Sequence, residues 1–449
     1  MHRDRRWVGT GLFVALAGLA SPALAQNLFV VTATGNGNTV TVGADNIIDL
    51  VDSAVNTQDQ FAQFQSVDTT FALNYGGIAD AITITKNSGN TQATLTFGPT
   101  GTSRTFNGTS QDDLQNQIED YLKKDGGADF TAFLKAVNAQ SVIAVSDGNP
   151  NATTNRMANW SFDHFGFSAD QRKGYLLKFD FGGAAPEPAA TPAPQGGGDD
   201  GAAPGNGQDN GMSAPVMRRA TAGFQVYLGA TAQTYTAGDF DGETATIFGA
   251  ADLNFSTRVG LSLGSFIGFN TVGDADVFHA GITLGLPVRL VLPDDQTPFT
   301  WQVTPFGQVG GSASEDIGAG GLIIGGGVTS YAAWHIDDRW TLAMANQYSK
   351  FEGEKLTFDD FEIDPGVSQG MLKNALRVSY RFGEGGWYAY GGAAHSKFLD
   401  DASVDSWISP SVGLGYSSQA GSGIQIGFVG DYGDDYSASG FRVAGNLVF

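Results

Sequence analysis

The C-terminal half of the chain alternates between apolar and polar residues, and this alternation restricts the fold more than any other feature. From Ala220 to Phe449 the alternating runs are separated by turns every ten to sixteen residues. A period of two places apolar side chains on one face of a strand and polar side chains on the other. In a closed antiparallel barrel the first face meets lipid, the second lines a lumen, and no strand edge stays unpaired. We count twelve predicted strands, near residues 221–236, 243–255, 257–271, 276–292, 298–311, 319–335, 339–351, 369–382, 386–398, 406–418, 422–432 and 438–449.

The last predicted strand ends the chain on an aromatic residue. Its sequence is F-R-V-A-G-N-L-V-F, and one face carries Phe441, Val443, Gly445, Leu447 and Phe449. An apolar face on an unpaired edge strand would promote aggregation in water. We therefore expect lipid against this face and closure of the barrel by pairing with the first strand, residues 221–236.

Charged residues on the polar faces are expected to point into the lumen. Lys373, Arg377 and Arg381 alternate with apolar residues on one strand, and three cations in a row would be costly in lipid. The expected lumen-facing charges are Arg289, Lys373, Arg377, Arg381, Asp431 and Arg442. Small residues between them leave room for water, for the linker, or for part of the N-terminal region. The alternation does not choose among these occupants.

The connections between strands alternate between acidic, longer loops and shorter turns. The longest loop is 352–368. Long loops on the outer side of the membrane and short turns on the inner side are typical of outer-membrane barrels. Paired carboxylates such as Asp400, Asp401, Asp434 and Asp435 would then lie at the cell surface. Their oxygens suit divalent cations that bridge lipopolysaccharide, and a solvated acidic rim is the alternative interpretation.

The residues before the barrel divide into three parts. Residues 1–25 combine three arginines, a short apolar run and the ending A-L-A, which predicts a signal peptide for export. Residues 26–183 predict a small α+β domain. Residues 184–215 are rich in Pro, Gly and Asp and predict a linker, and the barrel then occupies 216–449.

Short alternating runs in the N-terminal domain predict an antiparallel meander covered by helices. The runs lie at 69–75, 80–86, 91–97 and 103–106, with further strands predicted at 142–145 and 175–183. Helical spacing predicts helices near 45–65, 111–122, 130–137 and 151–165, the second of them opened by Ser110 and Asp113 as a capping box. We expect all four helices to cover the sheet.

Composition excludes several classes of protein. The chain has a net charge of −22, which makes nucleic acid an unsuitable partner, and it contains no cysteine for disulfides, thiol catalysis or metal binding. After the N-terminus no run of eighteen apolar residues occurs, which excludes a helical membrane protein. No residue pattern predicts a cofactor.

This layout of signal peptide, separate domain, Pro/Gly-rich linker and C-terminal barrel resembles the autotransporters of Gram-negative bacteria. The resemblance implies a barrel that anchors, and exports, the domain before it. The terminal strand resembles the signal that the barrel-assembly machinery reads in outer-membrane proteins, which implies that machinery, outer-membrane lipid and lipopolysaccharide as partners. Autotransporters thread a helix through the barrel directly before its first strand, but residues 211–223 contain Pro215, Gly211 and Gly223 and do not predict one.

The one enzyme motif in the barrel sequence lacks the local structure that it requires. Residues 260–264 match G-x-S-x-G, but that motif needs a sharp strand-to-helix turn, and alternation continues through it here. No histidine stands where it would form a base for a serine, so we predict no catalytic residues. Three functions stay open: an outer-membrane anchor displaying an adhesive or binding domain, a porin-like channel with a periplasmic or plugging N-terminal domain, and an outer-membrane hydrolase. We favour the first.

Overall fold

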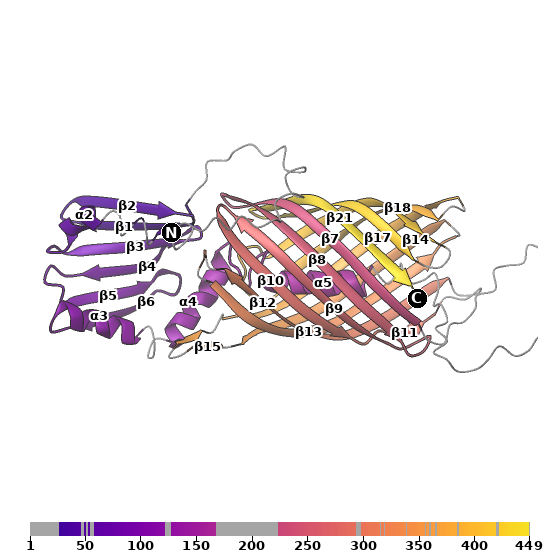
Figure 1. Cartoon of the computed structure of the whole chain (residues 1–449), viewed down its shortest axis with the longest axis horizontal. Coiled ribbons are helices and arrows are strands. Elements are labelled where there is room, and N and C mark those ends of the chain that lie inside the picture. Colours follow the sequence, from indigo (N-terminus) through magenta and orange to yellow (C-terminus); the bar gives the residue numbers. More distant parts are fainter. Residues whose placement is uncertain are drawn as a thin grey trace, which may run out of the picture.

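The predicted barrel is confirmed as a closed antiparallel barrel of twelve strands (Figure 1). The structure, a computed structural model, describes residues 27–448 except 46–48, 51–52, 54–57, 122–126, 168–222, 293–297, 315, 318, 338, 355, 359–360, 364–365, 384–385 and 419–421. The predicted signal peptide, linker and strand 175–183 therefore lie outside the described residues. Among the described residues, no helix combines the length and the apolar character needed to cross a membrane.

Each barrel strand pairs with its neighbours in the chain, and the last strand pairs with the first. The strands are β7 (Gly223–Ala237), β8 (Phe240–Asn254), β9 (Gly260–Val272), β10 (Ala275–Gly285), β12 (Phe299–Ser314), β13 (Ala319–His335), β14 (Trp340–Glu354), β17 (Ser368–Phe382), β18 (Trp387–Phe398), β19 (Ser406–Ser417), β20 (Gly423–Gly433) and β21 (Tyr436–Val448). A short segment, β11 (Val288–Val291), continues β10 beyond Pro287 and pairs with β12. The expected closure occurs between β21 and β7, with Phe441 opposite Ala232 and Leu447 opposite Val226.

The outside of the barrel is apolar and the inside is polar. Large apolar side chains are exposed on every barrel strand, as with Ile247, Leu263, Ile282 and Leu376, while their sequence neighbours point inward. Aromatic pairs gather at the end with the short turns, where the ring pairs Phe299–Trp334, Trp340–Tyr380 and Trp387–Tyr416 lie. An apolar band flanked by aromatic residues is the surface of an outer-membrane β-barrel.

The N-terminal region forms a six-stranded antiparallel sheet in the order β2-β1-β3-β4-β5-β6. Its strands are β1 (Phe29–Gly35), β2 (Asn38–Ala44), β3 (Thr69–Tyr75), β4 (Ile78–Lys86), β5 (Gln92–Phe97) and β6 (Thr102–Asn107), and its helices are α2 (Gln58–Phe61), α3 (Gln111–Asp120) and α4 (Gly127–Gln140). The meander β3–β6 is as predicted, and Ser110 caps α3 by accepting from the Asp113 amide. The β1–β2 hairpin adds two strands to those predicted, and residues 142–145 form turns rather than the predicted strand.

Helix α5 (Thr153–Phe165) corrects our prediction for residues 151–165, because it lies inside the barrel and does not cover the sheet (Figure 1). Nearly all of its side chains are buried, including polar ones such as Thr153, Asn155 and Ser161. A helix that packs on a sheet buries only one of its faces, whereas a helix inside a polar lumen is enclosed on all sides. Polar residues on several sides of α5, such as Thr153, Arg156 and Ser161, therefore find hydrogen-bond partners on the inner wall.

The N-terminal region rests on the barrel end that carries the long connections. The carbonyl of Gly148 accepts hydrogen bonds from the Ser403 and Val404 amides, at 2.9 and 3.2 Å, and from Ser403 Oγ at 2.8 Å. Gly148 has φ of +84°, and a Cβ there would meet the Asn138 carbonyl oxygen, so glycine is needed at this position. One buried apolar cluster joins Phe29 and Ile143 to barrel residues such as Phe240, which couples the two parts by packing.

Candidate functional site

The most developed site of the molecule is the contact between α5 and the inner wall of the barrel. At the start of the helix, Thr153 Oγ1 lies 3.0 Å from His279 Nδ1 on β10. One turn later, Arg156 Nη1 donates to Thr246 Oγ1 of β8 at 3.1 Å. The contacts between the barrel wall and α5 therefore start at the end of the barrel on which the N-terminal sheet rests.

Two glutamines of the wall hold the middle of α5 through its backbone. Gln308 Nε2 on β12 donates to the Met157 carbonyl at 3.0 Å, and Gln347 Nε2 on β14 donates to the Ala158 carbonyl at 3.0 Å. Ser161 Oγ donates back to Gln347 Oε1 at 3.3 Å. The two glutamine amides and the Ser161 hydroxyl thus pair with the helix or the wall, as buried polar groups generally do.

Glycines of the wall give the helix its space. A Cβ on Gly264 would lie 2.6 Å from the Trp160 ring, and one on Gly310 would lie 2.8 Å from Met157 Sδ. A Cβ on Gly285 would overlap the Phe165 ring. Any larger residue at these three positions would displace a side chain of α5. The small residues that the sequence placed in the lumen are therefore matched to this helix.

His164 near the end of α5 meets Ser262 and Asp252 of the wall. His164 Nε2 lies 2.5 Å from Ser262 Oγ and 3.4 Å from Asp252 Oδ1, and all three residues are buried. A catalytic triad needs the carboxylate on the other imidazole nitrogen, so that one nitrogen stays free to take the serine proton. Here both oxygens approach the same nitrogen, and Ser262 belongs to the regular strand β9 without the turn of a nucleophile elbow. The arrangement fixes the helix in place.

Charged residues expected in the lumen have different partners. Arg442 Nη1 lies 2.5 Å from Asp163 Oδ2 of α5, and Lys373 Nζ contacts Asn159 of the same helix. Arg377 lies over the Tyr390 ring at 3.9 Å and donates to Gln425 Oε1 at 3.3 Å. Two of the three cations of β17 thus lie in the lumen. The third, Arg381, shares their face of β17 and is exposed close to the short turn after the strand, so its lumen position stays a prediction.

The two remaining predicted charges are also placed by hydrogen bonds. Asp431 accepts from Ser409 Oγ and, at 3.0 Å, from Gln233 Nε2. Arg289 Nη2 donates to Asn254 Oδ1 at 2.8 Å near the short turns. Between α5 and strands β17–β21, β7 and β8 lies a cavity of about 190 Å³, lined by Lys373, Arg377, Arg442, Arg156, Asp163 and Asp431 among others.

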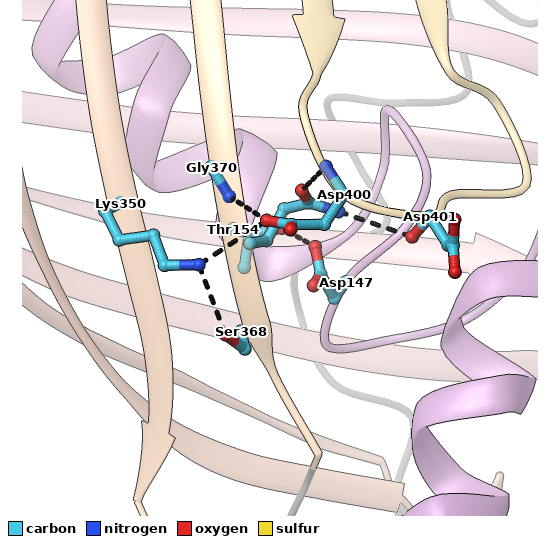
Figure 2. A network of polar contacts seen from close by, with 8 residues as sticks. Asp147, Thr154, Lys350, Ser368, Gly370, Asp400 and Asp401 are labelled. Atoms are coloured by element: carbon cyan, nitrogen blue, oxygen red, sulfur yellow. Dashed lines mark hydrogen bonds and ion pairs between the residues drawn. The ribbon is translucent and has the colours of Figure 1, made fainter.

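A polar network at the barrel mouth links the start of α5 to the loops (Figure 2). Asp147 accepts from Thr154 Oγ1 and from the Gly148 amide, both at 2.8 Å. Burial raises the pKa of Asp147 to about 6. Nearby, Asp400 accepts from the Gly370 amide at 2.9 Å, which lowers the pKa of Asp400, and lies 3.4 Å from Lys350 Nζ.

The predicted metal candidates do not form a metal site in the part of the chain that is described. No cluster of three or more His, Asp or Glu residues suited to a metal ion occurs there. Asp400 and Asp401 lie in the loop after β18, and Asp434 and Asp435 form the turn between β20 and β21. Cation binding at these loops stays a prediction.

The expected assembly signal lies on the outer face of β21. Phe441, Val443 and Leu447 are exposed there, Gly445 pairs with Leu228, and Phe449 is outside the described residues. Sequence reasoning found these strand positions but missed the residues of α5 that bind the wall. The available signal was the polar character of residues 151–165 on all sides, which a helix on a sheet does not need.

Comparison with known proteins finds no matching family model and no matching curated protein. Among solved structures, the barrel is similar to the translocator domain of the autotransporter NalP from Neisseria meningitidis, with a TM-score of 0.38 and 11% identity, over 51% of this chain and 88% of that one. The β domain of the Bordetella autotransporter BrkA matches with a TM-score of 0.39 and 14% identity, over 51% and 100%. The NanC porin matches with a TM-score of 0.31 and 11% identity, over 49% and 98%.

Proposed function

We propose that the protein is an outer-membrane anchor that displays its N-terminal sheet domain at the cell surface, with α5 as the stalk that crosses the barrel. The observation that carries the proposal is the direction of α5. Thr153 contacts His279 in the half of β10 that follows the long connections, whereas His164 contacts Ser262 next to the short turn before β9. Short turns of outer-membrane barrels face the periplasm and long loops face outward. In that orientation the sheet domain is extracellular.

The direction in which α5 runs through the barrel also supports a role of the barrel in export. The chain runs from the sheet domain through the lumen to the periplasmic end, and the first barrel strand, β7, begins at that end with Gly223 opposite Asn254. A signal peptide at residues 1–25 would deliver the chain to the periplasm, and the sheet domain would pass outward as the barrel assembles.

A porin-like channel is the second candidate, and the cavity beside α5 favours it. The cavity of about 190 Å³ has room for several water molecules beside the helix. Cations and carboxylates line it, so it is suited to hold water or small ions. Conduction of larger solutes would require α5 to leave the lumen, which would break its contacts with the wall.

Single-cysteine labelling tests the proposed orientation, because the chain contains no cysteine of its own. Ser88→Cys places a thiol in the exposed turn between β4 and β5, and Arg339→Cys places one in the short exposed turn before β14. We expect a membrane-impermeant maleimide to label Ser88→Cys on intact cells and Arg339→Cys only after permeabilisation. The reverse labelling pattern would contradict surface display.

A further inference from the structure

One face of the N-terminal sheet carries hydroxyl groups in two rows that cross all six strands. The pairing of the strands aligns the first row as Thr39, Thr34, Thr70, Thr85, Thr94 and Thr105. It aligns the second row as Thr41, Thr32, Ala72, Thr83, Thr96 and Ser103. These residues, called the threonine face below, form a lattice in which every position except Ala72 bears a hydroxyl.

The threonine face is the solvent side of the sheet. The other side packs α3 and α4 onto Leu95, Phe97 and Phe106, so the alternate residues of each strand point away from the helices. All positions of the threonine face are at least partly exposed. Neither row contains a charged residue, although the whole chain has a net charge of −22.

Hydrogen bonds between neighbouring strands hold the side chains of the threonine face in fixed positions. Thr94 Oγ1 lies 2.9 Å from Thr105 Oγ1, Thr70 Oγ1 lies 3.1 Å from Thr85 Oγ1, and Thr32 Oγ1 lies 3.2 Å from Thr41 Oγ1. β-branched side chains are already restricted at χ1. The strands of the sheet run side by side in Figure 1 with little change of direction, and side-chain ladders are one known cause of flat sheets.

A rigid, flat and uncharged lattice of hydroxyl and methyl groups is suited to a surface that is itself a lattice. Neighbouring strands are about 4.8 Å apart, and alternate residues of an antiparallel strand are about 6.8 Å apart. These two repeats are close to those between water oxygens on the exposed planes of ice. Each hydrogen-bonded pair still offers one hydroxyl hydrogen and several lone pairs to water.

We propose that the threonine face binds ice. The absence of charge on the threonine face supports this proposal. The surface of ice is neutral and presents hydrogen-bond donors and acceptors throughout. The threonine face is likewise neutral and carries hydroxyl groups, although the rest of the chain is acidic. Fixed side chains lose little entropy when ordered water forms over them, which favours binding by preorganisation. Combined with the surface display proposed above, on which its cellular role rests, the face would hold a cell against ice.

The test measures how much of the full chain, folded in lipid nanodiscs, enters slowly growing ice. The variant Thr34→Lys with Thr94→Lys places two charges on separate strands of the first row. The matched control, Gln63→Lys with Gln115→Lys, places the same charges at exposed positions away from the threonine face. Circular dichroism checks that all proteins retain their sheet content.

We expect the unchanged protein and the control to enter the ice and the threonine-face variant to enter it roughly tenfold less, because its charges would have to be desolvated. Exclusion of the unchanged protein from ice would overturn the proposal, and so would equal incorporation of all three proteins. Self-association in sedimentation that the threonine-face variant abolishes would also overturn it, since the face would then bind a second copy. The experiment is independent of orientation in the cell, so its failure is distinct from failure of surface display.

Discussion

Arg442 on the last barrel strand and Asp163 on α5 form an ion pair, with 2.5 Å between Nη1 and Oδ2. Arg442 also donates to the Tyr227 hydroxyl of the first strand at 3.2 Å. The strands that close the barrel therefore also hold the helix that fills it. Both side chains of the pair retain some exposure, 16% and 30%, toward the cavity beside α5.

Removal of one partner of this pair is expected to destabilise the plugged barrel. Because the pair is partly buried, we expect Arg442→Gln to cost about 1–3 kcal/mol, between the values for exposed and buried pairs. The measurement is the temperature at which the barrel unfolds in gel-mobility assays. Asp163→Asn should restore part of the loss in the double variant. Additive losses in the double-mutant cycle would argue against coupling between the two residues.

A larger residue at Gly264 is expected to expel or shift α5. The Cβ position of Gly264 lies 2.6 Å from the Trp160 ring, so Gly264→Leu would overpack the lumen at a cost of about 1–3 kcal/mol. We expect higher conductance in planar bilayers than for the unchanged protein. Gly307→Leu is the control, since a Cβ there meets nothing within 4 Å. Equal conductance of both variants would show that α5 does not close the lumen.

The dependence of the protein's folding stability on pH is expected to include a contribution from Asp147. Burial raises its pKa from 3.8 to about 6, so the protonated form stabilises the folded state fully below about 3.8. That contribution is lost as the pH rises to about 6. Its upper limit is about 3 kcal/mol, at about 1.4 kcal/mol per pKa unit. Asp147→Asn should therefore raise the melting temperature at pH 8 and change it little at pH 4.

The outcome for Asp147→Asn depends on the groups around this position. The amide oxygen of the variant can still accept from Thr154, and the charges nearby are those of Asp400 and Lys350. Melting curves of both proteins between pH 4 and pH 8 give the difference that isolates this residue. A difference that stays constant with pH would mean that Asp147 does not titrate within this range.

The terminal phenylalanine is expected to matter for assembly of the barrel. Phe441, Val443 and Leu447 are exposed on the lipid face of β21, and the alternation of the sequence predicts the same face for Phe449. Phe449→Ala should reduce the amount of heat-modifiable barrel in the membrane. Val448→Ala, on the other face of the strand, is the control. Normal heat-modifiable migration of Phe449→Ala would refute an assembly role.

The alternation of the sequence was sufficient to predict the barrel. A period of two is a local property, so it fixes which residues share a face of a strand without knowledge of partners. The strand count, the closure of β21 on β7 and the lumen position of Lys373 follow from it, as does the meander β3–β6. The prediction of a strand at residues 142–145 was wrong because four consecutive residues of this kind fit either a strand or a turn.

The helical spacing did not decide the place of α5, which only the tertiary structure settled, together with the contacts that depend on it. The same helical spacing suits a sheet surface and a lumen, because periodicity describes the helix and not its partner. His164 and Ser262 are 98 residues apart, and no local pattern could bring them together. The threonine rows depend likewise on the register of six strands. Each strand's own sequence set which face its threonines share, and only the pairing of the strands aligned them into a lattice.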